Sequence, residues 1–260
     1  MTTETRQLDT TVLEQRVKRM YQEVALEPER DFHFETGRAL AQRLGYPAEE
    51  LDGIPAAAIE SFAGVGYFLD LAAIEPGEAV LDLGSGSGTD SFLAALAGGS
   101  SGRVIGVDMT DEQLAKSRRL AVEGGFGNVD FRVGYIERPP VEPEGFDCVI
   151  SNGVVNLSAD KQRVFAETAR VLRPGGRLAI ADIVTTRQLT EAIVNNADLW
   201  ASCIGGATQH DTYRNLIEAA GLTITATRVN PYGFLSTQAR NASVTYGVHS
   251  ISLLATKPRR

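Results

Sequence analysis

The sequence predicts an α/β fold built on a mostly parallel sheet with helices on both faces. Three observations lead to this fold class. From residue 79 onward, short apolar runs alternate with longer amphipathic segments, which is typical of βαβ units. The first apolar run ends in a glycine-rich loop that opens a helix. The composition, with 43% hydrophobic and 22% charged residues, is that of an ordinary globular protein.

The chain is predicted to divide into an N-terminal helical cap segment at residues 1–75 and a sheet-forming core at residues 76–260. No linker of biased composition separates the two parts. Within the core, insertions on the substrate side are expected at residues 184–212 and 230–247. The second insertion is predicted to be a loop, and its length suits a functional lid.

In the cap segment, Thr11 and Glu14 have the spacing of a capping box, in which a hydroxyl and a carboxylate satisfy free N–H groups at a helix start. A second helix is predicted at Arg38–Leu44, where a glycine and a proline follow it. A third helix is predicted to start at Pro55, because proline is favourable at the first helical position. Two glycines within residues 61–67 predict a bend or loop.

In the core, each predicted strand is an apolar run bounded by glycine or polar residues. Ser158 is the expected N-cap of the third core helix, and a turn at Arg173-Pro-Gly-Gly176 precedes the fifth strand. The seven predicted strands cover residues 79–83, 103–108, 128–133, 146–151, 177–183, 222–229 and 250–256, and the helices cover residues 89–97, 111–122, 159–171 and 211–220.

The strongest functional signal is the run Val80-Leu-Asp-Leu-Gly-Ser-Gly-Ser-Gly88, which follows a strand and opens a helix. Glycines let the backbone approach a ligand closely, and a positive φ costs them little. The G-x-G-x-G spacing differs from the G-x-G-x-x-G of dinucleotide folds. A tight connection without a ligand is the alternative interpretation of such a loop.

Two carboxylates at neighbouring strand ends favour a ligand over that alternative. Asp82 precedes the first glycine, where it would repel a pyrophosphate and would suit a cation such as the amino group of a methionine moiety. Asp108 ends the next strand, a position that suits hydrogen bonds to both hydroxyls of a ribose. Met109 follows, where its side chain can lie against an adenine face.

These features resemble class I S-adenosylmethionine-dependent methyltransferases. Three further segments are similar to that family: Gly134-Tyr-Ile-Glu137, Ile150–Leu157 and Arg170–Leu178. The resemblance implies a Rossmann-like, seven-stranded sheet whose last strand is antiparallel and lies beside the sixth. It also implies that S-adenosyl-L-methionine is the cofactor. The residues expected to bind it are Asp82, Gly84, Gly86, Gly88, Asp108, Met109, Ile136, Glu137 and Asn152.

Within the family, Gly106–Thr110 and Leu199–Ala207 resemble arsenite methyltransferases, whose pattern has three cysteines. Trivalent arsenic is thiophilic, so those enzymes hold it with thiolates. Here the first region, Ala63–Gly66, has no cysteine, and Gly153 occupies the second position. Only Cys203 remains. We therefore predict that the scaffold resembles arsenite methyltransferases and that the substrate differs.

Catalytic side chains are expected on the segments that roof the crevice, and His33, Tyr67 and Cys203 are the candidates. His33 lies between two phenylalanines, which suits a general base poised near neutral pH. A histidine packed at a helix junction is the alternative for that residue. Cys203 adjoins two glycines, which indicates close approach to a substrate, whereas a lone cysteine can equally be a small buried side chain.

The charge and cysteine content limit the function classes. A net charge of −8 argues against nucleic acid as a partner. No apolar run has the length of a membrane helix, no secretory signal is visible, and two cysteines are too few for a disulfide framework, so a cytoplasmic location is expected. No metal-ligand cluster is expected. The predicted partner is a small-molecule substrate, and the oligomeric state stays open.

Three alternatives stand beside a small-molecule methyltransferase. The first is a metalloid methyltransferase that works with fewer thiols. The second is a nicotinamide-dependent oxidoreductase, which Asp82 and the glycine spacing disfavour. The third is a protein that binds S-adenosylmethionine without turning it over.

Overall fold

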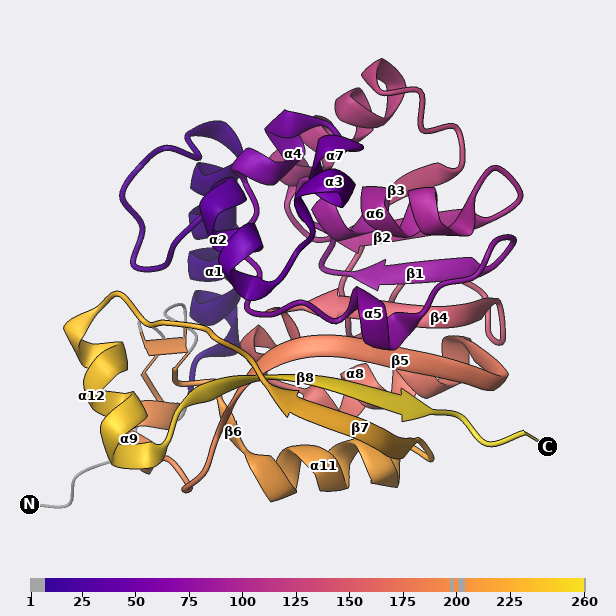
Figure 1. Cartoon of the computed structure of the whole chain (residues 1–260). Coiled ribbons are helices and arrows are strands. Elements are labelled where there is room, and N and C mark those ends of the chain that lie inside the picture. Colours follow the sequence, from indigo (N-terminus) through magenta and orange to yellow (C-terminus); the bar gives the residue numbers. More distant parts are fainter. Residues whose placement is uncertain (1–7, 197–198, 201–203, 260) are drawn as a thin grey trace, which may run out of the picture.

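The computed structural model of the chain describes residues 8–196, 199–200 and 204–259 and confirms the predicted α/β fold (Figure 1). Its central sheet has the strand order β3-β2-β1-β4-β5-β8-β7, and the short β6 pairs with β5 outside this path. The strands are β1 (Ala79–Leu83), β2 (Arg103–Asp108), β3 (Val129–Val133), β4 (Phe146–Asn152), β5 (Leu172–Thr185), β6 (Thr208–Gln209), β7 (Thr223–Val229) and β8 (His249–Thr256).

The last strand, β8, lies between β5 and β7 and is antiparallel to both. The other pairings of the sheet are parallel. This arrangement confirms the predicted place of the last strand, and the two-residue β6 is an addition that the sequence did not predict. The turn predicted at residues 173–176 does not interrupt the hydrogen-bonded strand. It instead appears as a register shift between β4 and β5.

Helices cover both faces of the sheet. Alternate residues of the buried strands belong to two hydrophobic cores, one on each face of the sheet. Val80 and Cys148 pack on the face covered by α5 and α6, whereas Leu81 and Val149 pack on the face covered by α8 and α11. The helices are α1 (Thr10–Leu26), α2 (Gly37–Leu44), α3 (Ala48–Asp52), α4 (Ala56–Glu60), α5 (Leu69–Ala72), α6 (Thr89–Gly98), α7 (Asp111–Glu123), η1 (Val155–Leu157), α8 (Lys161–Val171), α9 (Glu191–Val194), α11 (His210–Ala219) and α12 (Thr237–Tyr246).

Two predicted helix caps are wrong, and the reason is the same in both. Asp9 caps α1, where its carboxylate accepts hydrogen bonds from the N–H groups of Thr11 and Val12. Asp160, rather than Ser158, accepts the N–H of Arg163 at the start of α8. In each case a carboxylate two residues from the predicted hydroxyl supplies the stronger acceptor.

The insertion at residues 230–247 is not the loop that we predicted, because it contains α12, whose N-cap Ser236 accepts the N–H of Ala239.

At the other end of the chain, α1 lies beside the end of the sheet toward which the β1 arrow points (Figure 1). The carboxyl ends of the parallel strands lie at this end of the sheet. Among the described residues, none of the helices combines the length and apolar character needed to cross a membrane.

Candidate functional site

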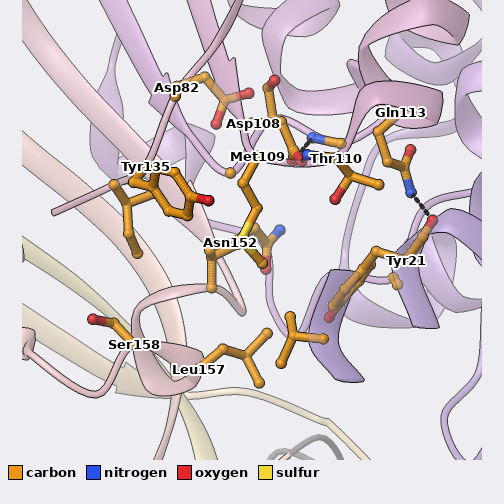
Figure 2. Close-up of a pocket in the computed structure, with 18 of the residues that line it drawn as sticks. Tyr21, Asp82, Asp108, Met109, Thr110, Gln113, Tyr135, Asn152, Leu157 and Ser158 are labelled. Atoms are coloured by element: carbon orange, nitrogen blue, oxygen red, sulfur yellow. Dashed lines mark hydrogen bonds between the residues drawn. The ribbon is translucent and has the colours of Figure 1, made fainter. Parts of the chain in front are cut away.

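A cavity of about 270 Å³ opens at the carboxyl ends of β1, β2 and β4. Its acidic end carries Asp82 and Asp108, and Asn152 lies between that end and an apolar wall formed by Leu157 and Tyr21 (Figure 2). The residues predicted to bind the cofactor that line this cavity are Asp82, Gly84, Gly86, Asp108, Met109, Ile136, Glu137 and Asn152. Gly88 is not in the lining. It is the N-cap residue of α6, and a Cβ on it would collide with the rings of Phe92 and Phe131.

The glycine loop wraps closely around the end of β2. Gly84 has a φ of +77°, and a Cβ on it would lie 2.5 Å from the side chain of Val154, so only glycine fits here. The N–H of Gly86 donates to Asp108 over 2.9 Å, and the N–H of Thr110 donates to the other oxygen of Asp108 over 2.8 Å. Burial raises the pKa of Asp108, and these N–H groups oppose the rise. The loop therefore holds this carboxylate in a fixed orientation beside the cavity.

The side chain of Asp82 is a buried carboxyl group with a raised pKa. Only 2% of the residue is exposed, and the hydroxyl of Ser91 donates to it over 2.6 Å. Burial raises the pKa of Asp82 to about 8, and the neighbouring charge of Asp90 adds to the rise. The carboxyl therefore holds a proton at neutral pH while the cavity contains no cation. A bound ammonium group would favour the ionised form.

Asp90 and Asn152, which both line the cavity, form a network with Tyr46. The carboxylate of Asp90 accepts the hydroxyl of Tyr46 over 2.6 Å and the side-chain amide of Asn152 over 3.1 Å. Burial raises the pKa of Asp90 to about 6, and these two hydrogen bonds limit the rise. Asn152 also accepts the N–H of Val65 over 2.8 Å and donates to the carbonyl of Gly66 over 3.0 Å. It thus fixes the bend at residues 61–67 against the end of β4.

Sequence reasoning missed several lining residues. Asp90 is one, and Ser85 is another: its buried hydroxyl has no hydrogen-bond partner among the described residues. Gln113 accepts the hydroxyl of Ser87 over 2.5 Å and donates to the carbonyl of Tyr21 over 2.9 Å, which ties α7 to α1. The positions of both serines inside the glycine motif were a usable signal. The role of Gln113 depends on a contact between helices far apart in sequence.

Two of the three predicted catalytic residues, His33 and Tyr67, do not line this cavity. His33 is not among its lining residues, and its ring packs edge-on against Phe34 at 4.7 Å between centroids. Tyr67 is also outside the lining; its hydroxyl lies 3.5 Å from Glu50, and burial raises its pKa to about 12. Cys203 lies outside the described residues. The catalytic roles of the three remain predictions.

Thiols are absent from the described lining of the cavity. Cys148 is fully buried in β4, where burial raises its pKa to about 12 and so disfavours the reactive thiolate. Among the described residues, no three histidine, cysteine or acidic side chains are placed to hold a metal ion. The chemistry of the cavity therefore lies in its carboxylates, hydroxyls and backbone amides.

Comparison with known proteins gives consistent matches. The family described as "Methyltransferase domain" matches residues 74–221. An arsenite methyltransferase of Halobacterium salinarum is 44% identical over 187 residues, which are 72% of this chain and 48% of that protein. Human arsenite methyltransferase is 41% identical over 137 residues, which are 49% of this chain and 36% of that protein. The chain thus spans about half the length, or less, of these curated relatives.

A solved structure of similar fold is an arsenic(III) S-adenosylmethionine methyltransferase from Chlamydomonas reinhardtii. It has 29% sequence identity and a TM-score of 0.63, and the match covers 86% of this chain and 74% of that one. A geranyl diphosphate methyltransferase solved with sinefungin shares the fold at a TM-score of 0.66 and 18% identity, over 94% of this chain and 99% of that one.

Proposed function

We propose that this chain, which belongs to the methyltransferase-domain family, transfers the methyl group of S-adenosylmethionine to a small-molecule acceptor by in-line displacement. One observation carries the proposal. The cavity joins a glycine loop to two carboxyl groups at the ends of adjacent strands, the buried Asp82 and the half-buried Asp108.

The lining fits this cofactor group by group. We assign the ammonium of the methionine moiety to Asp82 and the ribose hydroxyls to Asp108. The unpaired hydroxyl of Ser85 offers one further donor and acceptor to a polar ligand group. Met109 and Ile136 supply apolar surface for the adenine. The bound cofactor supplies an electrophilic methyl group.

The protein's own contribution is orientation and exclusion of water. Leu13 and Val17 of α1 line the cavity together with Leu157 and give it apolar surface. Fixing two reactants in an aligned geometry is worth up to about 7–11 kcal/mol of a reaction barrier. A general base is needed only for an acceptor that arrives protonated.

We infer that the acceptor is an organic molecule rather than arsenite. The described lining offers no thiolate, and soft trivalent arsenic prefers sulfur ligands. Arsenite is the second candidate, because the relatives from Halobacterium and human are arsenite methyltransferases. A protein that binds the cofactor without turnover is a more remote candidate.

We also infer a cytoplasmic location and no nucleic-acid acceptor. The net charge of −8 opposes binding to a phosphate backbone, and two cysteines cannot form a disulfide framework.

Calorimetry and a turnover assay test the proposal together. S-adenosylmethionine and S-adenosylhomocysteine should bind one site, and NAD should not bind. A panel of small organic acceptors should then release S-adenosylhomocysteine in a manner that depends on the acceptor. Release driven by arsenite, with methylated arsenic as product, would reverse the choice of substrate. Binding of NAD alone would overturn the methyltransferase assignment.

A further inference from the structure

A buried ammonium group lies next to the cavity without lining it. Lys161, at the start of α8, is 8% exposed, and its Nζ donates to the carbonyl oxygens of Asn156 over 3.1 Å and Ser158 over 2.8 Å. The same Nζ lies 4.7 Å from the ring centroid of Trp200. Burial lowers the pKa of Lys161 to about 8, and the carboxylates of Asp182 and Glu137 oppose that shift. The group is therefore predominantly charged at neutral pH.

On one side, Lys161 holds a turn that forms part of the cavity wall. Leu157 and Ser158 belong to this turn, and both line the cavity. The hydroxyl of Ser158 donates to Glu137, which lines the cavity as well. A ligand that contacts Glu137 is thus two hydrogen bonds from the ammonium, and a ligand that contacts Ser158 is one hydrogen bond from it.

On the other side, Lys161 faces the substrate-side insertion. Trp200 is 5% exposed, and its indole N–H donates to the carbonyl of Val194. Gly206 passes so close that a Cβ on it would overlap the carbonyl oxygen of Asn156 and press on the indole ring. Gly206, which contacts Trp200, therefore packs directly against the turn whose carbonyl groups accept hydrogen bonds from Lys161.

We propose that Lys161 is a positioning residue that couples ligand binding in the cavity to the packing of the Trp200 side chain. The link runs from Glu137 through Ser158 and the ammonium to the indole. Because such coupling is reciprocal, packing of the Trp200 side chain against the turn also strengthens ligand binding in the cavity. The proposal rests on the proposed function in one respect only, which is the choice of S-adenosylhomocysteine as the probe.

The chain contains a single tryptophan, so fluorescence excited at the long-wavelength edge of the indole absorption, where tyrosine does not absorb, reports on Trp200 alone. S-adenosylhomocysteine should change the wavelength and intensity of this emission, with the same midpoint as its calorimetric Kd. In Lys161→Met the ligand should still bind, with a Kd about five- to tenfold weaker, and the emission change should be lost. Lys161→Arg, which keeps the cation, should restore part of the response.

Two further variants keep the test decisive. Lys257→Met is the matched control, because Lys257 also donates to two backbone carbonyls, those of Ala169 and Leu172, and lies outside the cavity lining. It should retain both the Kd and the emission change. Ser158→Ala leaves the buried ammonium in place and removes the hydrogen bond to Glu137. It should bind the probe with a reduced emission response, even if Lys161→Met fails to fold.

The outcomes separate this inference from the proposed function. If the wild-type protein binds S-adenosylhomocysteine while Trp200 emission stays unchanged, the link is wrong and the methyltransferase assignment stands. A full emission response in Ser158→Ala or in folded Lys161→Met also overturns the link. If calorimetry detects no binding to the wild type, both proposals fail.

Discussion

The hydroxyl of Tyr46 donates a 2.6 Å hydrogen bond to the carboxylate of Asp90, which lines the cavity. Tyr46 follows α2 in the N-terminal part of the chain, whereas Asp90 lies in the first turn of α6, directly after the glycine loop. Both side chains are buried. This contact therefore ties the N-terminal helices to the loop that is proposed to bind the cofactor.

Tyr46→Phe should destabilise the protein by about 1–3 kcal/mol, because it leaves a buried carboxylate short of a donor. It should also raise the pKa of Asp90, since the Tyr46 hydrogen bond lowers it. Urea denaturation measures the free energy of unfolding. Tyr67→Phe is the matched control, because its hydroxyl makes only a 3.5 Å contact to Glu50. Equal stability losses in the two variants would contradict the role given to Tyr46.

Asp82 should make cofactor binding depend on pH. Its carboxyl, with a pKa of about 8, must lose a proton to pair with an ammonium group, so affinity for S-adenosylmethionine should rise from pH 6 to pH 9. Calorimetry in buffers of different ionisation enthalpy should detect proton release at pH 7. Asp82→Asn should bind weakly with a flat pH profile. Proton uptake on binding would contradict this assignment.

The same carboxyl affects stability in the opposite direction. Between the unfolded pKa near 3.8 and the folded value of about 8, the folded chain holds the extra proton, so the free energy of unfolding should fall as the pH rises through this window. The raised pKa of Asp90 acts in the same direction up to about pH 6. Denaturant titrations of wild type and Asp82→Asn measure the effect, and the slope should be smaller in the variant.

Asp108→Ala should weaken the binding of S-adenosylhomocysteine by about 10- to 100-fold, because hydrogen bonds to a charged group contribute about 1.5–3 kcal/mol each. It removes the acceptor that orients the Gly86 amide as well as the proposed ribose contact. Calorimetry measures the Kd. Asp130→Ala on β3 is the control, because that carboxylate is exposed and pairs with Arg132 at the surface. Its Kd should match the wild type.

Gly64→Ala should lower the free energy of unfolding by about 1–3 kcal/mol through overpacking. A Cβ there would lie 2.5 Å from the side-chain amide of Asn152 and would force that residue away from the bend it holds. Gly127→Ala is the control, because a Cβ at Gly127 meets no atom within 4 Å and neither glycine has a positive φ. If Gly64→Ala were as stable as the control, the close packing at the bend would be wrong.

The parts of the fold that local sequence dictates were predictable. The strands at 79–83 and 103–108 match the structure at both ends, because each is an apolar run that stops at a glycine or at a loop-favouring residue. The same reasoning predicted that Asp82 and Asp108 lie at the carboxyl ends of neighbouring strands. The antiparallel last strand came from the family resemblance, since no local pattern specifies which strands pair.

What the sequence could not predict depends on long-range contacts. Tyr46 and Asp90 are far apart in the chain, and nothing in either local pattern indicates that they meet. His33 between two aromatic side chains suited a catalytic base, yet its ring packs against Phe34 outside the cavity lining. The helix α12 was missed because polar residues dominate its sequence, and only Ala239 and Ala242 are buried.

The position of β8 also has a consequence for how the chain is made. This strand comes after all the others in chain order, yet it pairs with both β5 and β7. Until it leaves the ribosome, β7 and the aliphatic β5 each have an edge without its neighbour, and such edges invite pairing with other chains. A nascent chain stalled before residue 249 should therefore need chaperone protection, whereas a chain that includes β8 pairs these two edges itself.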